Sequence, residues 1–297
     1  MSRIELLVDD ESDGMRLDRY LADRLEGVSR SEIQRAIRAS SVTVGSKCIA
    51  QPSHTLRSQD RVVCEIPVKP ALTPTPLDLE IIYEDEQIVV VDKPAGLVVH
   101  PGAGSHEVTL VEALIVDRSL PQEGDPARPG VVHRLDKETS GIMVVGKTSA
   151  AVRSLKEQFA RRSVLKLYVA KVEGSFAEDE GLIEAPIGRD QRRPRCMAIN
   201  PQGRSAKTEF TVLRPLEGGS LILAHPLTGR THQIRVHMDY IGHPVVGDRL
   251  YGHAGSRMFL HAWRLRFAHP GSEESMRLEA LIPEEFPEYD FSSIRWP

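Results

Sequence analysis

Hydrophobic and polar positions at the start of the chain predict a small unit of helices and short strands. Residues 4–8 favour an opening strand. A helix is then predicted by leucines at helical spacing: Leu17, Leu21 and Leu25. Ser29 and Glu32 are typical of a capping box, in which Ser29 begins a second helix and Glu32 reaches back to it.

The second helix is predicted to have one buried face and one basic face. Ile33 and Ile37 fall on its inward side, which turns Arg35 and Arg38 to the opposite arc. Strands follow at residues 42–44, from Lys47, and at residues 60–66, with a turn at residues 45–46. A core this small usually depends on a neighbour or a ligand. We therefore expect residues 1–67 to form a small α+β domain.

Closely spaced prolines follow this unit: Pro67, Pro70, Pro74 and Pro76. Such spacing prevents a helix and favours an extended, semi-rigid connection. We therefore predict a linker at residues 68–79 and a second domain over residues 80–297.

From residue 79 onward the pattern predicts mainly strands, with two helices among them. The strands fall at residues 81–83, 88–91, 97–100, 131–133, 142–145, 164–172, 208–213 and 220–224. One helix is expected from its cap Ser149 to Arg162, and the other from its cap Thr231 to about Ile241. Because helices and strands do not alternate regularly, we predict an α+β fold with a mainly antiparallel or mixed sheet.

Length and composition agree with a globular protein of two domains. The 297 residues are 40% hydrophobic and 27% charged, which argues against a disordered or fibrous chain. The apolar runs are far shorter than the roughly 20 residues of a membrane span, and no apolar leader follows Met1. The 3 cysteines have no disulfide or zinc–thiolate spacing. We therefore expect a cytoplasmic protein, a monomer with no membrane partner.

Charge is distributed unevenly along the chain. The net charge of −4 argues against a non-specific nucleic-acid coat. Residues 185–208 nevertheless contain six basic side chains and a single acidic one, Asp190. Such a segment can bind phosphate locally or can be a solvated loop, and charge alone leaves both interpretations open.

Residues 141–148 match the phosphate-binding loop of nucleotide-binding proteins by letter only. Such a loop follows a strand and needs an open turn at its middle positions. Here the middle residues are Ile-Met-Val-Val, which belong inside a buried strand, and a polar turn precedes Gly141. We therefore predict no nucleotide cofactor.

Histidines gather in the C-terminal third without the spacing of a metal site. His232 and His237 are five positions apart, whereas paired ligands on a helix are about four apart, and no carboxylate has ligand spacing beside them. We therefore predict no metal.

Two polar segments contain candidate catalytic groups. In residues 132–141 a strand ends in a turn that holds His133, Arg134 and Asp136, and loops on rigid strands often hold catalytic groups. An Asp in a turn is nevertheless more often a turn-forming residue.

In residues 227–237, Arg230 and Arg235 bracket a helix start, where N–H groups and guanidinium groups present positive charge together. A structural ion pair is the alternative there.

Five motifs follow one another between about residues 80 and 285. They are DKPAGLVVHPG (92–102), HRLDKETSG (133–141), GRTHQIR (229–235), GHPVVGDRLYG (242–252) and LHA (260–262). In type and order these motifs resemble the RluA family of RNA pseudouridine synthases. Residues 1–67 resemble the small RNA-binding domain named after ribosomal protein S four, which precedes the catalytic domain in many members.

The resemblance implies an enzyme that isomerises uridine to pseudouridine in RNA. The reaction breaks the bond between ribose and the ring nitrogen, turns the uracil and bonds ribose to carbon 5, so no cofactor is expected. The family places the carboxylate nucleophile or base at Asp136, the partner guanidinium at Arg235, and the stacking ring and phenol at Tyr168. A carboxyl group in a dry pocket tends to take up a proton, which a neighbouring guanidinium opposes. Nucleophilic attack and elimination both remain open.

The resemblance also implies residues that contact RNA: His133, Arg134, Arg230, Gln233, Leu260, Arg35 and Arg38. Arg134 would help hold the flipped nucleotide, Arg230 would contact phosphate, and Leu260 would form a wall of the pocket. The expected partner is ribosomal RNA, as a large-subunit precursor. A transfer RNA substrate and a non-catalytic RNA-binding or ribosome-assembly factor are the alternatives.

Overall fold

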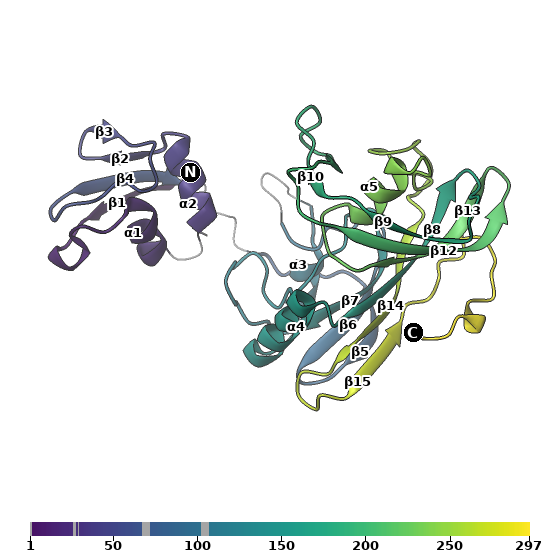
Figure 1. Cartoon of the computed structure of the whole chain (residues 1–297). Coiled ribbons are helices and arrows are strands. Elements are labelled where there is room, and N and C mark those ends of the chain that lie inside the picture. The colour runs from purple at the N-terminus through teal and green to yellow at the C-terminus, as the bar shows by residue number, and fades with distance from the viewer. Residues whose placement is uncertain (1, 26–27, 29, 67–71, 102–106) are drawn as a thin grey trace. The chain divides into compact units, whose positions relative to one another are not determined.

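The chain folds into two compact units (Figure 1). The computed structural model describes residues 2–25, 28, 30–66, 72–101 and 107–297. The smaller unit comprises Met1–Thr73 with Gln122–Pro129, and the larger unit comprises Pro74–Pro121 with Gly130–Pro297. Among the helices in these residues, none combines the length and apolar character of a membrane span.

In the smaller unit two helices and a four-stranded antiparallel sheet share one core. The helices are α1 (Leu17–Arg24) and α2 (Arg30–Arg38), after a short 3-10 turn at Asp10–Ser12. The sheet has the order β1 (Ser2–Leu7), β4 (Arg61–Ile66), β2 (Val42–Val44) and β3 (Lys47–Cys48).

The predicted faces of α2 are confirmed. Ile33 and Ile37 are fully buried, whereas Arg35 and Arg38 are exposed. The predicted cap Ser29 lies outside the described residues.

A buried carboxylate joins α1 to α2. The side chain of Asp18 is inaccessible to solvent and accepts hydrogen bonds from Arg16, Arg30 and Gln34. Burial alone would raise the pKa of Asp18, but these hydrogen bonds outweigh it and hold the pKa well below its usual range. The ionised form therefore stabilises the contact between the two helices.

A nine-stranded sheet forms the larger unit. Its path is β5 (Glu80–Glu84), β6 (Ile88–Lys93), β7 (Ser140–Gly146), β14 (Leu260–Ala268), β8 (Leu165–Glu173), β13 (Gly219–Pro226), β12 (Lys207–Leu216) and β9 (Glu180–Glu184), with β15 (Ser275–Glu279) paired to β14. Neighbours are antiparallel except β7 and β14, which are parallel. A separate hairpin pairs β10 (Ile187–Arg189) with β11 (Met197–Ile199). The predicted α+β fold with a mainly antiparallel, mixed sheet is confirmed.

The helices described in this unit are α3 (Leu110–Leu114), α4 (Ser149–Arg161) and α5 (Gln233–Tyr240), with a 3-10 turn at Phe291–Ser293. Helix α4 packs on β7, and α5 packs on β11, β12 and β13 (Figure 1). Both predicted caps are wrong by one residue. Helix α4 is capped by Thr148, whose hydroxyl accepts from the N–H of Ala151. Helix α5 follows His232 rather than Thr231, because the backbone of His232 is left-handed.

Two predicted strands are loops in the structure. Residues 97–100 and 131–133 each make one isolated bridge, through Val98 and Val131. Their apolar side chains pack against the core of the sheet, which gives a strand-like pattern without a continuous hydrogen-bonding partner.

Residues 141–146 of the segment that matches a phosphate-binding loop lie in β7, inside the sheet. Every residue of β7 is buried, as the apolar letters predicted. Gly141 has φ +117°, and a Cβ there would lie 2.1 Å from the carbonyl oxygen of Ala262 in β14. A glycine is therefore required for the close parallel pairing of β7 with β14.

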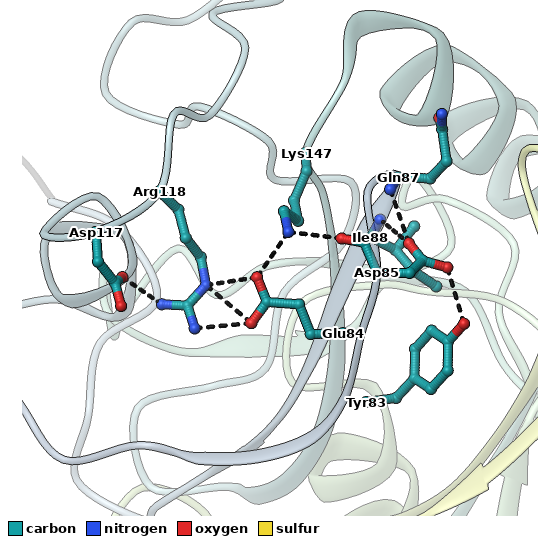
Figure 2. A network of polar contacts seen from close by, with 8 residues as sticks. All are labelled: Tyr83, Glu84, Asp85, Gln87, Ile88, Asp117, Arg118 and Lys147. Atoms are coloured by element: carbon teal, nitrogen blue, oxygen red, sulfur yellow. Dashed lines mark hydrogen bonds and ion pairs between the residues drawn. The ribbon is translucent and has the colours of Figure 1, made fainter.

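A polar network fixes the β5–β6 turn to the end of β7 (Figure 2). Within the turn, Asp85 accepts from the N–H groups of Gln87 and Ile88 and from the hydroxyl of Tyr83. Glu84 pairs with Arg118 and Lys147, and the ammonium of Lys147 also donates to the carbonyl oxygen of Asp85. These contacts lie at the Gly146 end of β7, opposite Ser140, where the loop before β7 joins the strand.

Candidate active site

One cavity in the larger unit gathers most of the predicted site residues. Its volume is about 420 Å³, within the usual range of small-molecule sites. Its walls come from the loop before β7, the end of α4, strand β8, the loop before α5 and the start of β14. The predicted residues that line it are His133, Arg134, Asp136, Tyr168, Arg230, Gln233, Arg235 and Leu260.

Lys93 binds the loop that carries Asp136. The Lys93 ammonium is inaccessible to solvent and donates to three backbone carbonyl oxygens, those of Pro94, Leu97 and Lys137. Burial lowers the pKa of Lys93 to about 7, although nearby carboxylates oppose this shift. The carbonyl oxygens compensate for the buried charge. Lys93 thereby fixes the turn directly after Asp136.

Arg235 joins Asp136 to a second carboxylate, Asp248. Its Nη1 donates to Asp136 Oδ2 at 2.9 Å, while Nε and Nη2 donate to the two oxygens of Asp248 at 2.6 and 2.9 Å. Burial alone would lower the pKa of Arg235, but the two carboxylates raise it above its usual value, so the guanidinium stays charged. The predicted pairing of Asp136 with Arg235 is thus present in the structure, across 99 positions of sequence.

Asp136 and Asp248 differ in their access to the cavity. The Asp136 side chain is 17% exposed, whereas that of Asp248 is 0% exposed. Asp248 is also occupied by the N–H groups of Leu250 and Tyr251. Asp136 can therefore meet a ligand, and Asp248 can only orient the guanidinium.

Tyr168 and Leu260 line the same cavity as Asp136. Burial and, secondarily, the charge of Asp136 raise the pKa of Tyr168 well above its usual value. The phenol is therefore neutral and can donate a hydrogen bond. Leu260 is only 3% exposed, which makes it an apolar wall of the cavity.

His232 faces Asp136 from the start of α5. Its Nε2 lies 3.9 Å from Asp136 Oδ2, and its Nδ1 lies 2.7 Å from the hydroxyl of Tyr251. That hydroxyl also accepts from the N–H of Met197 at 2.7 Å, which favours donation of its own proton to Nδ1. Burial lowers the pKa of His232, which keeps the ring neutral. The proton on the imidazole then sits on Nε2, toward Asp136.

Gln233 and His133 are held by the protein itself. The Gln233 amide donates to Lys207 and Thr208, and its oxygen accepts from Thr228 and Arg230. All four hydrogen-bonding positions are taken. The Nε2 of His133 accepts from the N–H of Val144, and the ring stacks on Phe159 with centroids 4.5 Å apart. Gln233 thus orders the cavity wall, whereas His133, whose Nε2 is used as an acceptor, keeps its Nδ1–H as a donor in that wall. The expected contact of both residues with RNA stays a prediction.

The remaining predicted contacts are basic side chains. Arg134 is exposed at the mouth of the cavity, and Arg230 donates from Nε to the carbonyl oxygen of Ser205. Arg35 and Arg38 lie in the smaller unit on the exposed face of α2. The basic segment includes β10, β11 and the loop between them, where Asp190 is occupied by its own loop.

Sequence reasoning missed several residues of the site. Asp248, Tyr251 and Lys93 lie inside quoted motifs, but a letter pattern does not say which members touch. Lys166 and Arg162 also line the cavity. Lys166 stands two residues before Tyr168, and alternation along a strand was the signal that could have placed it on the same face.

The chain is similar to known proteins over most of its length. Residues 87–240 match the family model described as RNA pseudouridylate synthase, and residues 15–62 match the S4 domain. The chain is 39% identical over 300 residues to a ribosomal large subunit pseudouridine synthase D of Zymomonas mobilis, covering 95% of this chain and 94% of the relative. It is 38% identical over 295 residues to an uncharacterised RNA pseudouridine synthase, YlyB, of Bacillus subtilis, covering 97% of each.

A solved structure is similar as well. The human RNA pseudouridylate synthase domain containing 1 protein superposes with a TM-score of 0.58 at 33% identity, covering 69% of this chain and 84% of that one.

Proposed function

We propose that this chain, which belongs to the RNA pseudouridylate synthase family and isomerises uridine to pseudouridine in RNA, uses Asp136 as its reactive carboxylate. One observation carries this assignment. Asp136 is the partly exposed carboxylate of the Asp136–Arg235–Asp248 group and faces the cavity. Arg235 favours its ionised form, which a nucleophile or base requires.

The surrounding groups fit the demands of the isomerisation. The uridine must leave its stack, which costs a few kcal/mol and least in a loop or single strand. Tyr168 then offers a ring for the uracil and Leu260 an apolar wall. When ribose passes from N1 to C5, the proton on C5 must leave and N1 must gain one. The neutral phenol of Tyr168, in the cavity wall, can give its proton to N1 and then take up the proton that leaves C5, so that it ends unchanged.

We place the substrate in large-subunit ribosomal RNA, as in the relatives named ribosomal large subunit pseudouridine synthase D. The S4 match at residues 15–62 supports an additional grip on RNA, with Arg35 and Arg38 on its exposed helix face. We further propose that the enzyme acts as a monomer, in the cytoplasm, on a large-subunit precursor.

The test is a pseudouridine map of total RNA from cells with and without the gene, by carbodiimide modification and primer extension. We expect one or a few large-subunit positions to disappear in the deletion and to return with the wild type. Asp136→Asn should not restore them, whereas Asp190→Asn, the same change at a carboxylate that binds its own loop outside the cavity, should. Loss of pseudouridine from transfer RNA instead would identify transfer RNA as the substrate. An unchanged map would favour a non-catalytic RNA-binding factor, and rescue by Asp136→Asn would refute the role of Asp136.

A further inference from the structure

We propose that Lys166, Arg162 and Arg230 form a subsite for one phosphodiester group of the RNA strand, next to the uridine. This inference rests on the proposed function, because it takes RNA as the ligand of the cavity. The three side chains come from separate elements: β8, the end of α4 and the loop before α5. All three line the cavity that contains Asp136.

Lys166 is a partly buried cation without a counter-ion. Its ammonium donates to the carbonyl oxygen of Thr228 at a long 3.3 Å, and in the described part of the chain no carboxylate pairs with it. Burial lowers the pKa of Lys166 to about 8, and Arg162 adds to the effect. The buried ammonium of Lys93, in the same unit, is by contrast compensated by hydrogen bonds to three carbonyl oxygens. A buried charge left unpaired destabilises the free protein, and an anionic ligand removes that cost.

The two arginines increase the unbalanced positive charge. Arg230 uses Nε for the carbonyl oxygen of Ser205, and burial, Arg204 and Arg162 together lower its pKa. Neither Arg162 nor Arg230 makes an ion pair with any described residue. The backbone of Arg162 is left-handed, with φ +60°, at the point where α4 ends. By contrast its neighbour Arg161 points to solvent and pairs with Glu157.

The three basic side chains lie where the RNA backbone next to the flipped nucleotide would pass. Lys166 and Tyr168 alternate to the same face of β8, about 7 Å apart along the strand. A nucleotide whose base lies against Tyr168 therefore has its own phosphate within reach of Lys166. Phosphodiester oxygens accept several hydrogen bonds at once, which matches an ammonium and two guanidinium groups.

Binding of the ten-nucleotide oligouridylate U10 tests the subsite without requiring turnover. Lys166→Met keeps the side-chain length and removes the charge, and Lys171→Met makes the same change on β8 outside the cavity. We expect Lys166→Met to weaken U10 binding about tenfold, or about 1.4 kcal/mol. The slope of log K against log salt should fall by about 0.7, the value for one single-strand phosphate. Lys171→Met should leave both unchanged, and Lys166→Arg should restore them.

A second pair of variants and the melting temperature separate ligand binding from a structural role. Arg162→Gln should reduce the salt slope, whereas the adjacent change Arg161→Gln should not. The free Lys166→Met protein should melt at the same or a higher temperature, because an unpaired charge has been removed. The subsite is overturned if Lys166→Met leaves the salt slope unchanged. It is also overturned if the wild type does not bind U10. A lower melting temperature together with an unchanged slope would show that Lys166 has a structural role instead. Failure of the wild type to make pseudouridine would refute the proposed function and leave the binding result valid.

Discussion

Asp136 and Asp248 share one guanidinium, and replacing each by asparagine should have opposite consequences. Asp248 accepts two hydrogen bonds from Arg235 and two from backbone N–H groups, with no solvent access. In Asp248→Asn one oxygen can still serve the backbone and Nη2. The new NH₂ group, however, faces the Nε–H of Arg235, donor against donor.

The expected loss of stability follows from this geometry. Removing one partner of a buried ion pair costs about 3–5 kcal/mol, and the lower end applies because Arg235 keeps its bond to Asp136. For a unit of this size, about 3 kcal/mol corresponds to a fall in melting temperature of roughly 6–12 °C. Asp136→Asn keeps an oxygen that can accept from Nη1 and removes only the charge of a partly exposed group, which costs about 1 kcal/mol or 2–4 °C.

Activity should rank the two variants in the reverse order. Asp136→Asn should abolish pseudouridine formation, by at least about 10³-fold. Asp248→Asn should leave folded enzyme that is slower by about 10²-fold, because the reactive carboxylate is displaced but present. Differential scanning calorimetry and single-turnover assays at 20 °C check both, with Asp190→Asn as the control. Equal loss of stability in both variants, or complete inactivity of folded Asp248→Asn, would refute this division of roles.

Three further predictions concern stability and tautomer. The pKa of Asp18 is lower in the folded protein than in the unfolded chain. Its contribution to stability is therefore present above about pH 4 and is lost as the pH falls below that value. In Asp18→Asn the stability of the smaller unit, followed by circular dichroism, should depend less on pH in this acid range. Gly141→Ala should lower the melting temperature far more than Gly96→Ala, because both have positive φ but an added Cβ would meet nothing within 4 Å at Gly96. Nitrogen-15 NMR at pH 7 should show His232 protonated on Nε2, and Tyr251→Phe should yield a mixture of tautomers.

The fold could be predicted from the sequence where one face of an element is uniformly apolar. The two faces of α2 and the buried interior of β7 follow from such patterns, and both are present. Strand β14 was missed because polar side chains are buried along it. His261 is fully buried, and Arg264 is 6% exposed with its Nε on Glu279. Hydrophobic alternation cannot reveal a strand whose buried positions include polar side chains.

The candidate site could be predicted residue by residue only where a motif matched. Asp136, Tyr168 and Arg235 meet in one cavity as expected. The role of Asp248 and the unpaired state of Lys166 depend on long-range contacts that letters do not encode. Gln233 shows the reverse case, since its place in a motif suggested a ligand contact but its hydrogen bonds are used internally.

One of the buried polar residues that obscure β14, His261, also contacts the reactive loop. Ser140 ends the loop that carries Asp136, and its hydroxyl accepts from Nη2 of Arg257 at 2.9 Å. The same hydroxyl lies 2.9 Å from Nδ1 of His261, whose ring burial keeps neutral by lowering its pKa to about 3. The loop is thus tied to β14 by side chains as well as by the parallel pairing at Gly141. An apolar β14 would be easier to predict, but it would lose the contact between His261 and Ser140 at this end of the loop.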